Sequence, residues 1–186
     1  MEDKYDMKTL RKIIALNKSK ALSNNDIIKQ LGGKVKVYSY DELSQFPTID
    51  ALLEPYESVV ILYETAPDFG HWCCLFKAKN DKGKDIISFF DPYALKVDDQ
   101  LNFINKDFRL KNNSYYPTLS ALMTDSNYPI EYNEHPVQQM KDGTNTCGRW
   151  CIMRLKLKHL PLKEFYDLFK SDKNFSSDDL VILATI

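Results

Sequence analysis

The sequence of 186 residues contains no apolar run that approaches the length of a membrane span. Its start, residues 1–6, has neither the basic region nor the apolar region of a signal peptide. Lys and Arg total 25 against 26 for Asp and Glu, and this formal net charge of -1 gives no reason to expect a nucleic-acid or membrane partner held by bulk electrostatics. We therefore expect a soluble intracellular protein that does not act at a membrane.

Cysteine and histidine are scarce, which restricts disulfides, metal sites and catalytic bases. Four cysteines do not make a disulfide framework in a chain of this length, and in a reducing compartment they should be thiols. A zinc site built from Cys147, Cys151 and His71 would need further ligands, and the sequence has no Cys-x-x-Cys pair. We expect Cys151 and the adjacent Cys73 and Cys74 to pack in the core, and we predict no metal and no cofactor.

Apolar patterns predict a sheet flanked by helices in a single domain, residues 1–186. A β-branched and aromatic run at 58–63 is typical of a strand buried on both faces. The next two strands, 71–78 and 85–90, should form a hairpin around the turn at 80–83. Further strands are expected at 35–38 and 129–134, and helices at 7–17, 23–31, 41–53, 98–108, 117–123, 147–157, 161–169 and from 176. The predicted fold class is α+β, a central mixed sheet of about five strands.

Polar residues stand at both ends of the predicted hairpin. His71 begins its first strand and Asp91 directly follows its second. Because a hairpin brings the start of one strand beside the end of its partner, we expect the two residues to be neighbours at one rim of the sheet. An aspartate beside an imidazole orients the ring and raises its basicity. Trp72 is either a core aromatic or a residue that packs against this site.

Cys147 stands where a polar, turn-forming loop changes into a dense apolar pattern. A cysteine on the first turn of a helix lies at the positive end of the macrodipole, which favours the thiolate. Gly148 beside it would let a substrate backbone approach closely. Among the three histidines, His71 is the best candidate base, since His135 precedes a proline and His159 is about 18 Å away along a helix that rises about 1.5 Å per residue.

Acyl transfer also needs hydrogen-bond donors for the developing oxyanion. A glutamine amide just upstream of the thiol and the backbone N–H of Cys147 would supply two donors. Two adjacent glutamines occupy that region, and we expect Gln139 to be the donor, with Gln138 as the alternative.

The order of these motifs resembles one family, the adenovirus-type (adenain-like) and ubiquitin-like-protein-specific cysteine proteases. The matching motifs cover somewhat under half of the chain and are Gly70-His71-Trp72, Phe90-Asp91-Pro92-Tyr93, Gln138-Gln139 and Thr146-Cys147-Gly148. The resemblance implies these roles: His71 as base, Asp91 as its orienter, Gln139 as oxyanion donor, Cys147 as nucleophile, and Trp72 and Gly148 at the substrate. The interval from Gln139 to Cys147, 147 minus 139, is eight residues and is longer than in the family, so the choice between the two glutamines stays open. The Pro-Asn signature of many relatives is also missing before the cysteine.

The resemblance further implies a function. It points to a cysteine endopeptidase of adenain- or SUMO-protease-like fold that cuts proteins after small residues, Gly-Gly or Gly-x. In biological terms it implies a viral or virophage-like maturation protease, a monomer in the host cytoplasm or the virion that processes capsid or structural precursors. An activating peptide or nucleic acid, as adenovirus-type relatives can need, stays open. Gly32-Gly33 either ends a helix or is a self-processing site.

Other functions remain open at this stage. The same triad would serve a deubiquitinase or a protease for ubiquitin-like modifiers. It would also serve acyl transfer to a protein, as in bacterial effector acetyltransferases that resemble this clan. The non-enzymatic alternative is a binding or structural protein in which the triad is coincidental or decayed.

Overall fold

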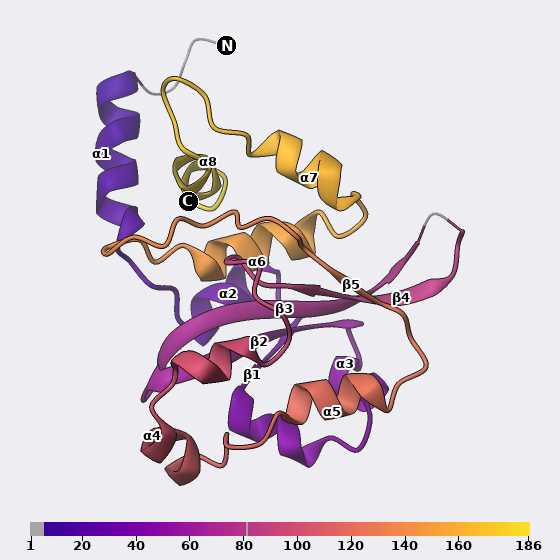
Figure 1. The fold of residues 1–186 in the computed structure, drawn as a ribbon. Helices are drawn as coiled ribbons and strands as arrows, with labels where there is room; N and C mark the ends of the chain where they lie inside the picture. Colours follow the sequence, from indigo (N-terminus) through magenta and orange to yellow (C-terminus); the bar gives the residue numbers. More distant parts are fainter. Residues whose placement is uncertain (1–5, 81) are drawn as a thin grey trace.

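The computed structural model describes residues 6–80 and 82–186, and a five-stranded mixed sheet forms its centre (Figure 1). The strand order follows the chain, with parallel pairs at the two edges and antiparallel pairs between them. The strands are β1 (Lys36–Ser39), β2 (Ser58–Ala66), β3 (Phe69–Lys79), β4 (Asp85–Phe90) and β5 (Ile130–Tyr132). The predicted α+β class with about five strands is confirmed.

Eight α-helices and two short 3₁₀ helices accompany the sheet in the described part of the chain. They are α1 (Met7–Lys18), α2 (Asn24–Gln30), η1 (Tyr40–Gln45), α3 (Ile49–Leu53), η2 (Asp99–Phe103), α4 (Lys106–Lys111), α5 (Thr118–Thr124), α6 (Cys147–Lys156), α7 (Leu162–Leu168) and α8 (Ser177–Leu183). The helical stretch predicted at 41–53, with Pro47 interrupting it, forms two helices, η1 and α3. Phe46 is extended before Pro47, as residues preceding proline prefer, and this divides η1 from α3. The helix predicted at 98–108 is likewise divided, because Asn105 caps a new helix, α4.

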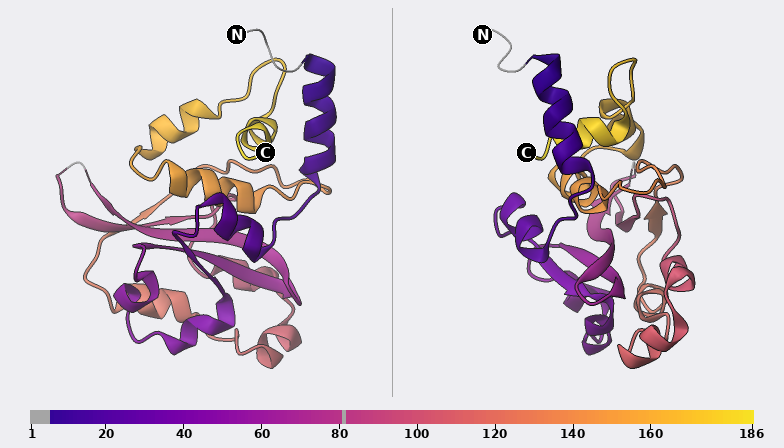
Figure 2. Two further views of the ribbon diagram at one scale, coloured as in Figure 1. Left: turned by 180° about the vertical axis from the view of Figure 1, so that it is seen from behind. Right: turned by 90° about the vertical axis from the view of Figure 1, so that its left-hand side faces the viewer.

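Helices cover both faces of the sheet (Figures 1 and 2). Along β3 the side chains of Trp72 and Cys74 enter a core with α2, α6, α7 and α8. Those of Cys73 and Leu75 enter a second core with η1, α3, η2 and α5 on the other face. This alternation follows from the two-residue period of a strand. β2 is divided between the same two cores, as predicted for a strand buried on both faces.

The helix that begins at Cys147, α6, lies directly on the first face of the sheet, and α1, α7 and α8 lie beyond it (Figure 1). α1 packs on α8. The pair Gly32-Gly33 follows α2 with positive φ angles of 64° and 73°, which confirms that these glycines end the helix. Their role as a self-processing site stays a prediction.

Some predictions fall outside the described residues. Residues 1–5, most of the start that lacks signal-peptide character, are among them, and so is Asp81 in the predicted turn. On either side of Asp81 the turn is closed by a hydrogen bond of 2.8 Å from the Gly83 N–H to the Asn80 carbonyl. Within residues 6–80 and 82–186, no helix combines the length and the apolar character needed to cross a membrane.

Candidate active site

His71 and Asp91 meet at the rim of the sheet where β3 begins and β4 ends. The antiparallel register pairs Cys74 with Phe90, the last residue of β4, so Asp91 leaves the sheet beside the start of β3. Nε2 of His71 lies 2.9 Å from Oδ1 of Asp91. Both side chains are buried, with Asp91 fully enclosed. The predicted contact between these two residues is therefore present.

The Asp91 carboxylate accepts three further hydrogen bonds. The Tyr93 backbone N–H donates to Oδ1 at 2.7 Å, and the Cys73 thiol and the Gln100 amide donate to Oδ2, each at 3.3 Å. The Asn133 side chain holds the Asp91 backbone, accepting from its N–H at 2.9 Å and donating to its carbonyl at 2.6 Å. All the groups that face the carboxylate can act as donors, which suits an ionised, acceptor-only side chain.

The imidazole of His71 is held in position and charged. Its ring stacks on that of Tyr93, with 4.5 Å between centroids and 14° between planes. Burial lowers the pKa of His71, but hydrogen bonds and charge from Asp91 and Cys147 outweigh this and raise its pKa to about 9. At neutral pH both ring nitrogens are therefore protonated and the ring is positively charged. Since Nε2 faces Asp91, the other nitrogen, Nδ1, is the one left for the thiol.

Cys147 is the first residue of α6, as predicted, and is 8% exposed. Thr146 precedes it, and its hydroxyl donates to Oδ1 of Asp178 at 2.5 Å. The same buried carboxylate accepts from the Trp150 indole and from the Gln139 backbone N–H, both at 3.0 Å. Asp178, on α8, thus joins the start of the cysteine helix to the loop that carries the glutamines.

Gln138, and not Gln139, directs its side chain into the site. Gln138 is 3% exposed, and its amide nitrogen donates to the Tyr93 hydroxyl and to the Thr144 carbonyl, each at 3.0 Å. Its backbone N–H donates to the Pro92 carbonyl at 3.0 Å. The Gln139 side chain lies at the surface, because its backbone N–H is the group turned inward toward the α8 carboxylate. Of the two glutamines that the sequence left open, the structure thus brings the Gln138 side chain to Tyr93 and leaves that of Gln139 at the surface.

Trp72 and Gly148 pack between α6 and the sheet, and their expected contacts with a substrate stay predictions. Trp72 is 4% exposed, belongs to the core under α6, and donates from its indole to the Leu22 carbonyl at 3.2 Å. A Cβ added to Gly148 would lie 3.1 Å from the Trp72 ring and 3.4 Å from the Leu22 side chain. The absence of a side chain at Gly148 therefore lets α6 approach β3 closely.

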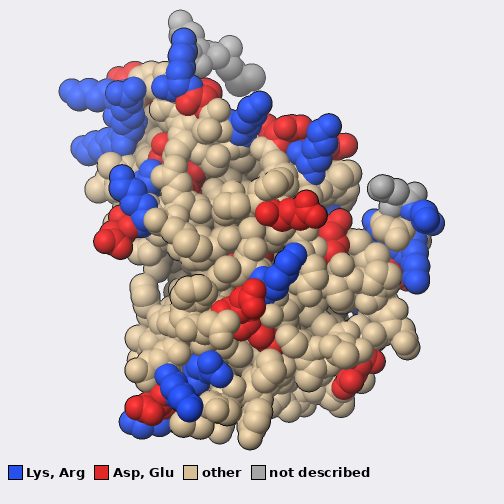
Figure 3. Space-filling model, in the orientation of Figure 1, with Lys and Arg blue, Asp and Glu red and all other residues tan. Residues whose placement is uncertain are grey.

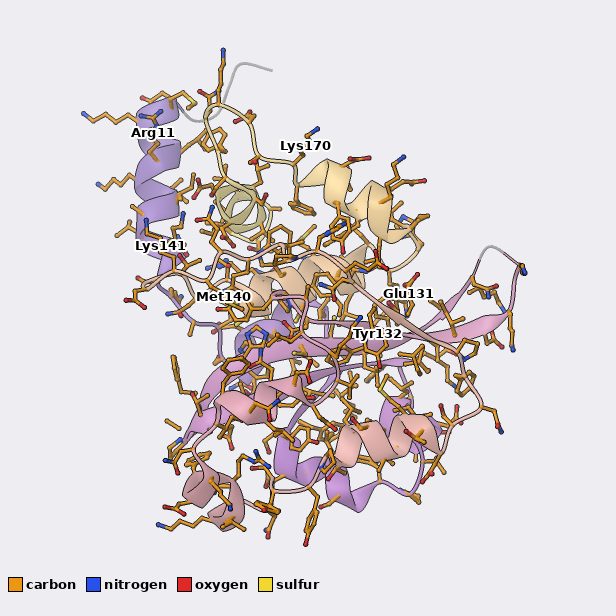
Figure 4. All side chains as sticks on the ribbon, in the orientation of Figure 1. Arg11, Glu131, Tyr132, Met140, Lys141 and Lys170 are labelled. Atoms are coloured by element: carbon orange, nitrogen blue, oxygen red, sulfur yellow. The ribbon has the colours of Figure 1, made fainter. Side chains whose placement is uncertain are left out.

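Two large apolar side chains are exposed close to the site along the chain. Phe69, two residues before His71, is 51% exposed, and Met140, two residues after Gln138, is 69% exposed. Met140 and Lys141 project from the loop that leads to α6 (Figure 4). Lys and Arg gather over α1 in the same view (Figure 3).

The side chains of His71, Cys73 and Asp91 also form a group with metal-ligating potential, with ligand atoms within 4.8 Å of one another. Burial and the nearby Asp91 raise the pKa of Cys73, so its sulfur stays a protonated hydrogen-bond donor and not a metal-binding thiolate. The hydrogen bonds described above account for this cluster. Cys151 and Cys74 are fully buried in the core, as predicted.

Four residues of the site were not among the predicted ones: Tyr93, Gln100, Asn133 and Asp178. A signal existed for Tyr93, because it follows Asp91 by two positions in the Phe90-to-Tyr93 motif and two is the period of a strand. The other three come from distant segments with no local pattern that marks them. His135 and His159 lie outside the cluster, and His159 lines a separate pocket at the other end of α6.

Comparisons with known proteins give one relative of high coverage. The chain is 40% identical over 169 residues to the protein named "Uncharacterized protein V9" of Sputnik virophage, a match that covers 89% of this chain and 94% of that protein. No family model matches. A crystal structure of the ASFV pS273R protease is similar at a TM-score of 0.48 and 13% identity, over 91% of this chain and 68% of that one. A likeness at this TM-score and identity is too weak to indicate a function.

Proposed function

The chain belongs to the family of the V9 protein of Sputnik virophage, and from its buried cysteine, histidine and aspartate we propose that it is a cysteine endopeptidase. In this proposal residues 1–186 form one catalytic domain. The observation that carries it is the buried His71 ring, which lies 2.9 Å from Asp91 and whose pKa is raised to about 9 by hydrogen bonds and charge from Asp91 and then Cys147, against the lowering effect of burial.

Cys147 is the proposed nucleophile and His71 its acid and base. The proton that the thiol gives up is held on His71, whose pKa of about 9 keeps it there at neutral pH. Asp91 orients the ring and stabilises its positive charge. The position of Cys147 on the first turn of α6 adds the positive end of the helix dipole. The sulfur attacks the scissile carbonyl, His71 protonates the leaving amine, and water then releases the acyl group.

The oxyanion would form between α6 and the loop that carries Gln138. The first N–H groups of a helix have no intrahelical acceptor, so the backbone N–H of Cys147 is available as one donor. The Gln138 amide and its hydrogen-bond partners form the opposite, side-chain part of the hole. In this proposal Gln138, and not Gln139, is the glutamine that lines the oxyanion hole.

The proposed substrates are proteins cut after small residues, Gly-Gly or Gly-x. Cys147 and His71 are only 8% and 7% exposed, so a residue next to the scissile bond must approach through a narrow opening, which favours glycine. Phe69 and Met140 are available to contact the flanking residues. The virophage relative supports a viral setting. Within that setting we propose that the substrates are capsid or structural precursors, cut in a host cell or virion.

A labelling experiment tests the proposal. Wild type, Cys147→Ala, His71→Ala and a control, Cys151→Ala, are incubated with a Gly-Gly vinyl-type electrophile built on a short peptide and on a ubiquitin-like protein. We expect labelling at Cys147 in the wild type and in Cys151→Ala, none in Cys147→Ala, and a labelling rate at least about tenfold lower in His71→Ala, because a free thiol is only a few per cent thiolate at neutral pH.

The outcomes separate the alternatives. Labelling that persists in Cys147→Ala, or a wild type that is not labelled by either probe, would overturn the nucleophile assignment. Preference for the peptide probe favours precursor maturation, and a strict need for the folded modifier favours a deubiquitinase or modifier protease. Transfer of an acetyl group from acetyl coenzyme A to protein would favour an acyltransferase instead.

A further inference from the structure

The Gln138 amide has no free N–H with which to bind an oxyanion. Its nitrogen donates both of its hydrogens, one to the Tyr93 hydroxyl and one to the Thr144 carbonyl, each at 3.0 Å. Its oxygen is buried without a hydrogen-bond partner among the described residues, but an oxygen is an acceptor and would repel an oxyanion. The hydrogen bond to the oxyanion therefore has to come from another group.

The Tyr93 hydroxyl meets this requirement. It accepts the hydrogen bond of Gln138, and within residues 6–80 and 82–186 no acceptor lies within bonding distance of its own hydrogen. Burial, with the charges of Cys147, Asp91 and Asp178, raises the pKa of Tyr93 to about 12, so the hydroxyl stays protonated at neutral pH. A hydroxyl that already accepts a hydrogen bond donates more strongly, because successive hydrogen bonds polarise one another.

Three contacts hold Tyr93 in register with the reacting groups. Its ring stacks on His71 at 4.5 Å, its backbone N–H donates to Asp91 at 2.7 Å, and its hydroxyl is held by Gln138. These contacts place the Tyr93 ring directly against the proposed acid and base, His71, and its hydroxyl against Gln138.

We infer that the Tyr93 hydroxyl is the side-chain donor of the oxyanion hole, and that Gln138 is a positioning residue which holds and polarises it. This inference rests on the proposed protease function. When the Cys147 sulfur forms its bond to the carbonyl carbon, the π electron pair moves to the oxygen, which accepts hydrogen bonds from Tyr93 and from the Cys147 N–H. Tyr93 keeps its proton, and the pair returns as the C–N bond breaks and His71 protonates the amine.

The variant Tyr93→Phe tests this inference, because it keeps the ring on His71 and removes only the hydroxyl. With a Gly-Gly peptide substrate we expect kcat to fall about 10²- to 10³-fold with little change in KM, as for loss of one oxyanion donor. The alkylation rate of Cys147 by iodoacetamide should stay at the wild-type value, because alkylation forms no oxyanion. Tyr132→Phe is the matched control, since Tyr132 lies on the edge strand β5 and its ring contacts the Lys96 ammonium group. This variant should cleave the peptide at the wild-type rate.

The variant Gln138→Leu provides a second test of the inference, which can be used if Tyr93→Phe does not fold. It leaves the Tyr93 hydroxyl in place but unsupported, so kcat should fall while the alkylation rate is kept. The double variant should lose no more than the worse single variant, because the two residues act as one unit. Wild-type cleavage by Tyr93→Phe, or a parallel loss of alkylation, would overturn the inference. A wild type whose cleavage does not depend on Cys147 would instead overturn the proposed function.

Discussion

At the scale of single residues, the charge on His71 depends on one carboxylate. Asp91 accepts hydrogen bonds from His71, Tyr93, Cys73 and Gln100 and has no Lys or Arg partner among the described residues. This position requires a side chain with two acceptor oxygens and no donor, because each of these four neighbours acts as a hydrogen-bond donor. An amide at the same position would turn its NH₂ toward at least one of these donors.

We therefore predict that Asp91→Asn lowers the pKa of His71 and reduces kcat by about 10⁴-fold, the loss that follows the equivalent change in a Ser-His-Asp triad. The measurement is peptide cleavage together with the pH profile of Cys147 alkylation. Asp98→Asn is the control, since Asp98 is similarly buried but bonds to Tyr40 and Tyr63. It should lower stability and leave the alkylation profile unchanged. A wild-type profile in Asp91→Asn would contradict the role of this carboxylate.

At the scale of elements, two glycines set how closely the strands and helices approach. A Cβ on Gly70 would lie 2.0 Å from the Tyr63 carbonyl oxygen and 2.8 Å from the Glu64 Cα, both backbone atoms of β2. A Cβ on Gly148 would instead meet side chains, of which the Trp72 ring is nearest at 3.1 Å. Backbone gives way less readily than side chains, so the β2–β3 contact is the stricter of the two.

We predict that Gly148→Ala lowers the free energy of unfolding by about 1 kcal/mol and that Gly70→Ala lowers it by about 3 kcal/mol, the two ends of the range for overpacked sites. Urea denaturation of both variants provides the measurement. Because Gly70 directly precedes His71, its variant should also lose cleavage activity. If Gly148→Ala raised KM without loss of stability, the packing role of Gly148 would be wrong and the expected substrate contact would be supported.

At the scale of the whole molecule, the buried His71 couples stability to pH. Its pKa is about 9 in the folded protein against an ordinary value of 6.5, so the folded state holds a proton that the unfolded state has lost between these values. The stabilisation is fully present below pH 6.5 and is lost as the pH rises through about 9.

We predict that the free energy of unfolding of the wild type falls between about pH 6.5 and 9, and that His71→Gln shows a smaller decrease over this window. Urea denaturation at several pH values measures both slopes. The difference between the two slopes reports the proton on His71 together with its interactions with Asp91 and Cys147. Equal slopes would show that the proton on His71 does not contribute to stability.

The order of elements was predictable because local patterns decide it. Alternating and continuous apolar runs marked β2, β3 and β4, and the hairpin they imply was enough to bring His71 to Asp91. The helix boundary at Ile104 was missed, since the cap residue Asn105 outweighs an apolar pattern that looks continuous. The choice between the two glutamines stayed open for a different reason: adjacent residues point in different directions, and only their tertiary partners decide which one faces inward.

The sequence by itself determined the α+β class, the meeting of His71 with Asp91, and the place of Cys147 at the start of a buried helix. Each of these depends on residues that are close in the chain or joined by one hairpin. Tertiary structure alone decided that Gln138 enters the site and that Trp72 and Gly148 belong to the core. It also decided which residues from distant segments hydrogen-bond the site: Gln100 and Asn133 bind Asp91, and Asp178 binds Thr146. The physical reason is that a buried polar group must be hydrogen-bonded, yet its partner can come from any segment that the packing brings within about 3 Å.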